Sequence, residues 1–203
     1  MKIIKYEKNK NGKYKIILED NNKINTYEDV ILKNNLLYKK NINEEDYNNI
    51  IEDNKYEEAY LSCVKYISIR LRSKYEIKLY LQKKKYDENI INTTIDKLLK
   101  DNLLDDKRFT KAFVKDKFNF STSGPYKIKQ ELIKQKIDNN IIEESIDIIT
   151  EEEINEKINK LIKKQLNTKK PKDLKLKNKI FMYLINLGYP KELILNNLNN
   201  YIA

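Results

Sequence analysis

Residues 73–98 read SKYEIKLYLQKKKYDENIINTTIDKL, and this stretch decides the fold. Its apolar residues recur at the three- and four-residue spacing of amphipathic helices. Ser73 and Glu76 form a Ser-x-x-Glu capping box at the first helix start, and Asp87 is a favourable N-cap residue for the next helix. The stretch therefore predicts two short helices joined by a tight turn.

The same pattern returns twice further along the chain. Gly124-Pro125-Tyr126-Lys127-Ile128 opens a second copy, and a third copy begins near Ile180 and includes Gly188 just past its first helix, where a left-handed residue is favoured. A further predicted helix precedes each copy, at residues 57–71, 107–119 and 154–166. Three-helix units of this size bury their apolar faces by stacking on one another. We therefore expect a mostly α fold of three tandem three-helix repeats in an elongated, curved array.

The first thirty residues predict strands instead of helices. Apolar side chains alternate with polar ones on both sides of Asn11-Gly12, a pair typical of tight hairpins, and a short third run spans residues 23–27. A helical period follows. These patterns give four predicted segments: a small β-meander with a helix at 1–52, and helical repeats at 53–106, 107–150 and 151–203.

The composition excludes most familiar catalytic sites. The 203 residues include no histidine and one cysteine, so histidine triads, disulfides and thiolate or imidazole zinc sites cannot be built within the chain. Cys63 lies among apolar residues at helical spacing and is interpreted as a core thiol. Asp105-Asp106 could in principle hold magnesium, but N-capping of a helix explains both aspartates. We predict no catalytic residue, no metal and no cofactor.

Charge and hydropathy point to a chain that acts on an acidic partner. No apolar run approaches the length of a membrane span, and the N-terminus is too charged for a signal peptide, so we expect a cytoplasmic protein with no membrane association. The formal net charge is +10, and bases outnumber acids most strongly in residues 155–203. Such a balance is typical of proteins that bind nucleic acid or acidic surfaces.

Three groups of residues together resemble the RecX family of recombination regulators. They are Ile69-Arg70-Leu71-Arg72-Ser73-Lys74-Tyr75-Glu76 with Leu81, then Leu103-Leu104-Asp105-Asp106-Lys107-Arg108-Phe109, then Ser123-Gly124-Pro125-Tyr126-Lys127-Ile128 with Glu131-Leu132. They occur in the family's order, and the resemblance covers roughly residues 55–203. Thr110 and Gln135-Lys136-Ile137 depart from the family pattern, at positions that concern packing and turn geometry.

The resemblance implies a non-enzymatic partner of the RecA recombinase. Members of this family lie along the RecA filament on single-stranded DNA, touch neighbouring protomers, and limit filament extension, ATP turnover, strand exchange and repressor cleavage. The partners implied are therefore the RecA filament and possibly the single-stranded DNA within it. We expect the chain itself to be a monomer.

Charge and position assign the contact residues. Lys74 and Lys78 lie on a polar stripe of the helix that follows Ser73, and Lys129 and Lys136 lie on the same stripe one repeat later. Arg70 and Arg72 stand at the turn into the first of these helices, and a guanidinium is hard to replace at a bidentate site. The C-terminal lysines expected to steer association are Lys169, Lys170, Lys172, Lys175, Lys177 and Lys179.

Other functions remain open at this point. A helical DNA-binding protein without RecA specificity would use the same basic stripes and would lose affinity for naked DNA steeply with salt. A helical-repeat adaptor for an unrelated acidic protein would bind neither DNA nor the filament. An enzyme has only Asp105-Asp106 as a basis, and would show magnesium-dependent nuclease activity.

Overall fold

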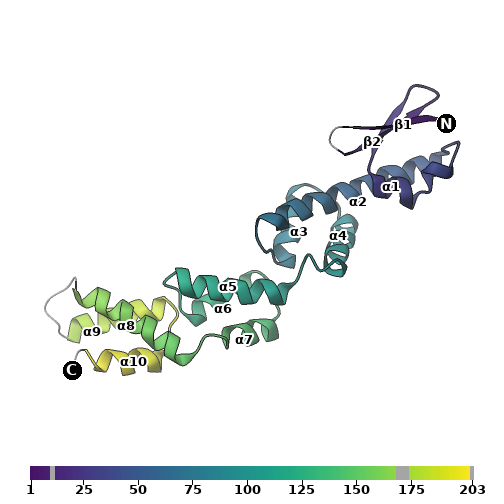
Figure 1. Cartoon of the computed structure of the whole chain (residues 1–203). Coiled ribbons are helices and arrows are strands. Elements are labelled where there is room, and N and C mark those ends of the chain that lie inside the picture. The colour runs from purple at the N-terminus through teal and green to yellow at the C-terminus, as the bar shows by residue number, and fades with distance from the viewer. Residues whose placement is uncertain (10–11, 168–173, 202–203) are drawn as a thin grey trace. The chain divides into compact units, whose positions relative to one another are not determined.

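The computed structural model describes residues 1–9, 12–167 and 174–201. It divides into two compact units: Met1–Leu71 with Ile77–Leu104, and Arg72–Glu76 with Asp105–Ala203. Helices dominate both units, and the single described sheet belongs to the first (Figure 1). The predicted class, a mostly α fold with a small N-terminal meander, is confirmed. The predicted curvature of the array stays a prediction.

The N-terminal meander is a three-stranded antiparallel sheet. Its strands are β1 (Ile3–Lys8), β2 (Tyr14–Leu18) and β3 (Lys23–Thr26), in that order across the sheet. Ile16 pairs with Tyr6 on one side and with Ile24 on the other. Part of the predicted Asn-Gly turn lies outside the described residues, but Gly12 has the positive φ of 81° that such a turn requires.

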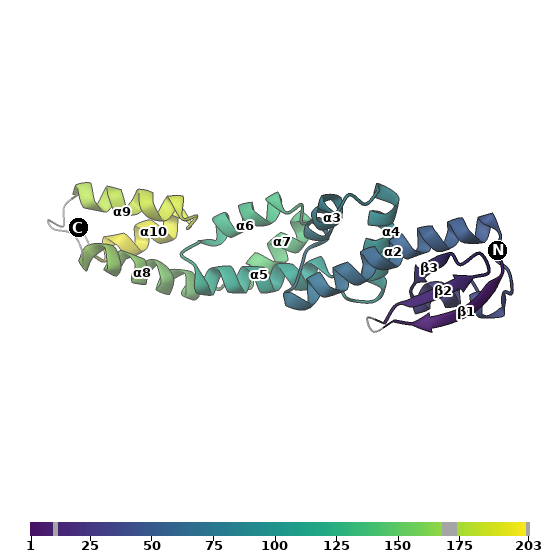
Figure 2. The same ribbon diagram turned by 90° about the horizontal axis from the view of Figure 1, so that it is seen from above.

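The sheet packs on the helices that follow it. These are α1 (Glu28–Lys33), the short 3-10 helix η1 (Leu36–Tyr38) and the N-terminal part of α2 (Glu44–Ile69). Ile16 and Leu18 from the sheet share one buried core with Val30, Leu36 and Ile50 from these helices. Figure 2 shows the strands beside this part of α2. So small a sheet needs an apolar face packed on other elements to be stable, and this shared core provides that packing.

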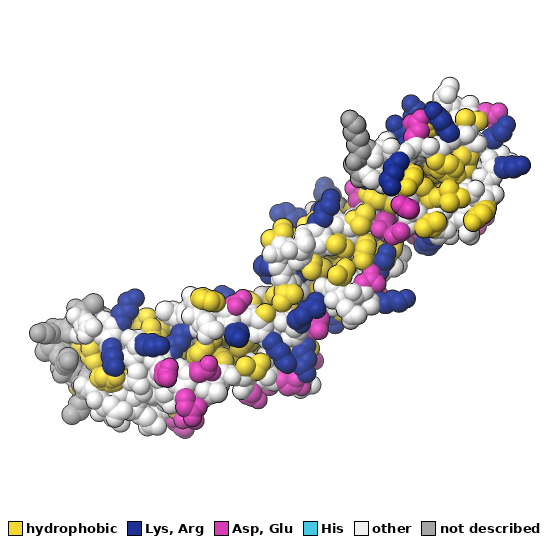
Figure 3. All heavy atoms as spheres, viewed as in Figure 1, with side chains coloured by type: hydrophobic (Ala, Val, Ile, Leu, Met, Phe, Trp, Pro, Cys, Tyr) yellow, Lys and Arg dark blue, Asp and Glu magenta, His cyan; other side chains and the backbone are white. Residues whose placement is uncertain are grey.

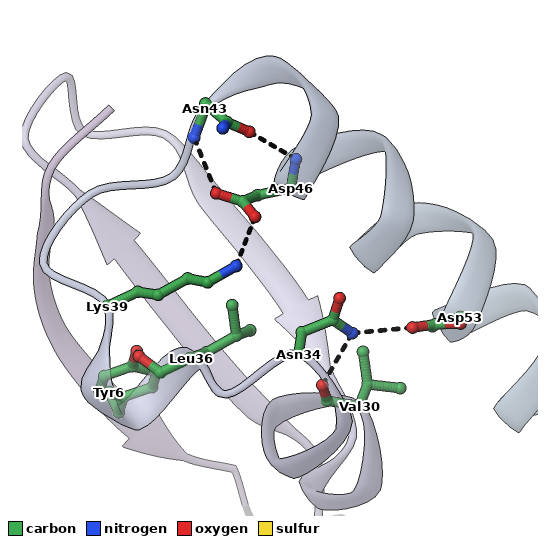
Figure 4. A network of polar contacts seen from close by, with 8 residues as sticks. All are labelled: Tyr6, Val30, Asn34, Leu36, Lys39, Asn43, Asp46 and Asp53. Atoms are coloured by element: carbon green, nitrogen blue, oxygen red, sulfur yellow. Dashed lines mark hydrogen bonds and ion pairs between the residues drawn. The ribbon is translucent and has the colours of Figure 1, made fainter.

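Polar contacts fix the start of α2 (Figure 4). The Asn43 side chain accepts a hydrogen bond from the Asp46 N–H, and the Asp46 carboxylate accepts one from the Asn43 N–H, which is a complete capping box. Lys39 lies 2.5 Å from the same carboxylate. The Asn34 amide donates to the Val30 carbonyl at 3.0 Å and to Asp53 at 2.8 Å, and so ties α1 to α2.

The boundary predicted between residues 52 and 53 lies inside α2, which is one helix of 26 residues. No proline or glycine interrupts residues 44–69. Ile50 of this helix belongs to the meander's core, whereas Ala59 and Cys63 belong to the next core along the chain. The meander and the first repeat therefore share a helix, and the helix predicted at 57–71 is the C-terminal half of a longer one.

The helices after α2 follow the predicted repeat. The first repeat continues with α3 (Lys74–Lys83) and α4 (Glu88–Lys100), the second contains α5 (Asp106–Phe120), α6 (Pro125–Lys134) and α7 (Asn139–Ile146), and the third contains α8 (Glu151–Asn167), α9 (Leu174–Asn186) and α10 (Lys191–Asn199). The N-cap predicted at Asp87 is present at the start of α4, Asp138 caps α7 in the same way, and Pro190 is the N-cap of α10.

Each repeat turns at a left-handed residue in the same place. Lys85, Lys136 and Gly188 have φ values of 65°, 57° and 86°. Left-handed residues are common just past the end of a helix because they satisfy its last carbonyl groups. The prediction for Gly188 is confirmed, and two lysines adopt the same conformation at the equivalent positions.

The start of α6 lies directly against the turn between α9 and α10. The Gly124 N–H donates to the Leu187 carbonyl at 2.7 Å, and the Tyr126 N–H donates to the Gly188 carbonyl at 3.0 Å. A Cβ added to Gly188 would lie 2.4 Å from the Lys127 nitrogen, and one added to Gly124 would lie 2.5 Å from the Gly188 oxygen. Only glycines allow two backbones to approach this closely.

Candidate functional site

Arg70 and Arg72, two of the predicted contact residues, stand at the turn into α3, and their surroundings differ sharply. Arg70 follows the last residue of α2 and is exposed, and its guanidinium donates to the Leu71 carbonyl at 2.9 Å. The Arg72 side chain is only 10% exposed and lies 3.8 Å from the Glu76 carboxylate. Arg70 thus lies at the surface, whereas Arg72 is placed to support the first turn of α3.

The turn into α3 is organised by several hydrogen bonds. The predicted capping box is present, because Ser73 Oγ accepts from the Glu76 N–H and the Glu76 carboxylate accepts from the Ser73 N–H. Ser73 Oγ also donates to the Gln135 side chain at 3.2 Å. Lys74 is exposed at this start, and its backbone N–H donates to Asp106 at 2.8 Å. The backbone of this motif is held by caps, which leaves the Lys74 side chain to solvent.

The two adjacent aspartates each cap a different helix. Asp105 accepts from the N–H groups of Lys107 and Arg108 at 2.8 and 3.0 Å, at the start of α5. Asp106 caps α3 through Lys74, and burial raises the pKa of its carboxyl group. Within residues 1–9, 12–167 and 174–201, no group of three or more acidic, cysteine or histidine side chains could hold a metal ion. The capping interpretation accounts for both residues.

Two of the predicted contact lysines are paired with glutamates of the following helix. Lys78 on α3 forms an ion pair with Glu88 on α4, and Lys129 on α6 forms one with Glu143 on α7, one turn further along its helix than the position that corresponds to Glu88. These pairs join the second and third helices of the first two repeats. A partner would have to displace a carboxylate to reach either ammonium group, so the predicted basic stripe is partly neutralised.

The remaining predicted residues lie on turns and on α9. Lys136 is exposed at the left-handed turn between α6 and α7. Lys175 and Lys179 are exposed one turn apart on α9, and Lys177 is half-buried between them. On the face shown in Figure 3, basic side chains occur with acidic ones beside them instead of forming one uninterrupted track. Three predicted positions lie outside the described residues: Lys169, Lys170 and Lys172.

Cys63 lies in the core of the first repeat, away from any surface. The Cys63 side chain is fully buried in the core of the first repeat, and burial raises the pKa of its thiol to about 11, so it stays protonated at neutral pH. This agrees with a core thiol. In the part of the chain that the structure describes, no helix combines the length and the apolar character needed to cross a membrane.

A second feature was not predicted: a cavity of about 680 Å³ in the first unit, between the meander, α2 and α3. It is lined by three lysines and three tyrosines among other side chains: Lys13, Lys65, Lys84, Tyr27, Tyr66 and Tyr80. The sequence does carry a signal for it, because Glu58, Leu61, Ser62, Lys65, Tyr66 and Ile69 recur at the spacing of one helix face. That face mixes polar and apolar residues, so its composition alone does not distinguish it from an ordinary solvent-exposed helix face.

The fold defines a class of proteins built from tandem three-helix domains. The family model described as "RecX, first three-helix domain" matches residues 59–98, and "RecX, second three-helix domain" matches residues 105–146. A crystal structure described as regulatory protein RecX superimposes with a TM-score of 0.85 at 23% identity, covering 96% of this chain and 98% of that chain. The RecX structure from Lactobacillus salivarius gives 0.65 at 28% identity, covering 71% of this chain and 95% of that chain.

Sequence relatives identify the family. The Regulatory protein RecX of Halalkalibacterium halodurans is 30% identical over 94% of this chain and 74% of its own length. That of Bacillus cytotoxicus is 30% identical over 81% of this chain and 62% of its own length. The chain belongs to the RecX family, and the resemblance predicted from three motifs is confirmed.

Proposed function

We propose that this chain is a regulator without enzymatic activity that binds RecA filaments on single-stranded DNA and restrains their growth and ATP turnover. The observation that carries the proposal is the recurrence of one helix-turn-helix unit, each turning at Lys85, Lys136 or Gly188. A chain with several similar surfaces suits a partner that is itself a polymer of identical protomers. Weak patches that engage successive protomers together give avidity.

The exposed cations at the helix starts and turns support a contact role. Arg70 and Lys74 flank the start of α3, Lys136 occupies the equivalent of Lys85 one repeat later, and Lys175 and Lys179 lie on α9. Arg72, which is largely buried beside Glu76, is assigned to the support of the α3 start instead of to partner contact. Lys78 and Lys129 contribute only when their glutamate partners are displaced.

Inhibition follows from preferential binding to one filament state. A ligand shifts a conformational or assembly equilibrium only by the difference between its affinities for the two states. A chain that bridges protomers at one spacing favours that spacing over the changes that accompany extension and nucleotide turnover. No reaction at the chain itself is required.

RecA-catalysed ATP hydrolysis on single-stranded DNA tests the proposal. The chain should slow hydrolysis when it is present at fewer copies than RecA protomers, because each bound chain affects several of them. Arg70→Ala combined with Lys74→Ala should weaken this inhibition, whereas the exposed pair Lys100→Ala with Lys163→Ala should not. Full inhibition by the first variant would contradict the assigned surface, and no inhibition by the unaltered chain would contradict the function.

A second candidate function rests on the net charge of +10 and the basic, aromatic cavity of the first unit. A DNA-binding protein without RecA specificity would bind naked single strands as tightly as filaments. Its affinity for naked DNA would fall steeply with salt, since each neutralised phosphate releases counterions. A salt titration of both complexes separates the two functions.

A further inference from the structure

The first two repeats each leave a large apolar side chain exposed at the same place. Ile69 is the last residue of α2 and is 77% accessible, and Phe120 is the last residue of α5 and is 87% accessible. The same spacing in sequence separates the buried residues Ile77 and Ile128, so the two exposed positions are equivalent. A single exposed apolar residue is ordinary on a protein surface. Its recurrence at equivalent positions of two repeats indicates a shared role.

The backbone beside the two side chains is also equivalent. The residue that follows each of them is extended: Arg70 has φ −162° and ψ 162°, and Ser121 has φ −122° and ψ 177°. Residues 70–73 then connect α2 to α3, and residues 121–124 connect α5 to α6, so the two connections have the same length. Both side chains therefore stand at the point where the first helix of a repeat gives way to the turn into the second.

The turn after Phe120 is held without the help of its ring. Ser121 Oγ donates to the Lys117 carbonyl at 2.7 Å and accepts from the Ser123 N–H at 3.0 Å. The Ile69 side chain is likewise mostly in solvent, so neither apolar side chain contributes much to the packing of its own unit. Alanine also favours helices more than isoleucine or phenylalanine does. Truncation of either side chain should therefore leave the fold intact.

Cations border both side chains. Residues 59–71 and 117–130 contain no aspartate or glutamate. Lys65 and Arg70, on either side of the first apolar side chain, are exposed, and so is Lys127 in the first turn of α6. The nearest acid along the chain is Asp116, one turn before the second apolar side chain. An apolar centre with a cationic border is complementary to a partner surface that has an apolar pocket and an acidic border.

Two equivalent surfaces on one chain fit a partner that is itself repeated. A partner with a single pocket engages one surface at a time, whereas a polymer of identical protomers offers a pocket to each. Nucleic acid would match the cations, but base stacking needs an aromatic or planar side chain, and Ile69 has none. The exposed side chains and their cations together therefore match a protein polymer better than a nucleic acid.

We propose that Ile69 and Phe120 insert into equivalent apolar pockets, each bordered by acidic side chains, on two protomers of one protein filament. The proposal rests on the proposed function, in which this filament is that of RecA. It adds the apolar anchors beside which the cations Lys65, Arg70 and Lys127 lie. Large side chains that become buried at the centre of an interface are typical of the residues that dominate binding.

Surface plasmon resonance with RecA filaments, assembled on an immobilised single-stranded oligonucleotide with a slowly hydrolysed nucleotide, measures the affinity. Ile69→Ala and Phe120→Ala should each weaken binding roughly tenfold, and the double variant roughly a hundredfold, since a large apolar side chain loses its burial in each case. Melting temperatures should stay almost unchanged, because substitutions of exposed residues alter stability little. The matched control is Leu32→Ala with Tyr38→Ala, which removes side chains of 57% and 87% accessibility away from the repeat position and should bind normally.

The single variants test whether both anchors are engaged together. If the chain used one anchor at a time, the other would remain after each truncation, and each single variant would lose no more than about twofold in affinity. Such small losses would overturn the proposal, and so would equal losses in the double variant and the control. Phe120→Leu should keep most of the affinity, whereas Phe120→Asp should weaken binding more than Phe120→Lys does, because of the acidic border. The reverse order of aspartate and lysine would overturn the assigned pocket.

The outcomes for the anchors and for the regulatory function are separable. Filament binding by the unaltered chain with an unchanged affinity in the double variant overturns the anchors and leaves the regulatory proposal standing. No filament binding by the unaltered chain overturns both. An equal loss of affinity for naked single-stranded DNA in the double variant would assign these side chains to nucleic acid, and a dimer that the double variant abolishes would assign them to self-association. Either result overturns the proposal.

Discussion

Gly188→Ala tests the backbone contact that joins the second and third repeats. The left-handed φ of 86° costs a non-glycine residue about 1–2 kcal/mol. The new Cβ would lie 2.4 Å from the Lys127 nitrogen and 2.7 Å from its Cβ, and such overpacking costs about 1–3 kcal/mol more. The free energy of unfolding should therefore fall by roughly 2–5 kcal/mol, which lowers the melting temperature by about 5–15 °C for a chain of this size.

Gly12→Ala is the matched control, because Gly12 has nearly the same φ of 81° but none of the atoms that the structure describes lies within 4 Å of an added Cβ. It carries the backbone strain alone and should cost about 1–2 kcal/mol. Thermal unfolding followed by circular dichroism, with urea titration of each variant, measures both. If Gly188→Ala costs no more than Gly12→Ala, the close approach of α6 to the α9–α10 turn does not exist as described.

Further substitutions test the caps, the buried charge and the arginines. Asp105→Ala should lower the urea midpoint by the equivalent of about 1 kcal/mol, since two N–H groups of α5 lose their acceptor. Lys157→Met should raise the free energy of unfolding by about 1 kcal/mol at pH 7, because the amine is buried beside Phe118 with no hydrogen-bond partner among the described residues. Burial lowers the pKa of the Lys157 amine, so the folded state binds fewer protons than the unfolded state. The stability of the unaltered chain therefore increases as the pH rises toward the pKa that the amine has in the unfolded state. The advantage of Lys157→Met should accordingly shrink in alkaline urea titrations. Arg70→Ala should leave the melting temperature almost unchanged and weaken inhibition of RecA, whereas Arg72→Ala should lower the melting temperature, because its side chain is only 10% exposed beside Glu76; equal effects on stability would contradict this division.

Much of the fold was predictable because its signals are local. The capping box at Ser73, the N-caps at Asp87 and Asp138, and the turn at Gly188 all depend on residues within a few positions of one another. The repeat strengthens these signals, because similar caps and turns are expected at matching positions of each copy. Local chemistry and tertiary packing agree at these places.

The rest depends on contacts that a single sequence does not display. Lysine gives no signal for a left-handed turn, so the equivalence of Lys85 and Lys136 with Gly188 in backbone conformation became visible only in the structure. The pairing of Lys78 with Glu88 and of Lys129 with Glu143 depends on how consecutive helices cross. Both pairs reduce the charge that the sequence had assigned to a binding stripe.

The continuity of α2 was also hidden, because its apolar residues serve two cores in succession. Ile50 faces the core of the meander, and Ala59 and Cys63 face the core of the first repeat. A change of buried face along one helix looks in sequence like a break between domains. The cavity beside Tyr66 has a different origin, since side chains from separate stretches of the chain line it and the sequence does not show that they meet.

Co-sedimentation with RecA filaments tests filament binding most directly. Filaments formed on long single-stranded DNA with a slowly hydrolysed nucleotide should carry the chain into the pellet, at fewer copies than RecA protomers and at salt concentrations that release it from naked DNA. Arg70→Ala with Lys74→Ala and Lys136→Ala should reduce the pelleted fraction well below that of the control Lys100→Ala with Lys115→Ala and Lys163→Ala. A chain that stays in the supernatant, or that pellets equally with naked DNA at the same salt, would contradict the proposed function.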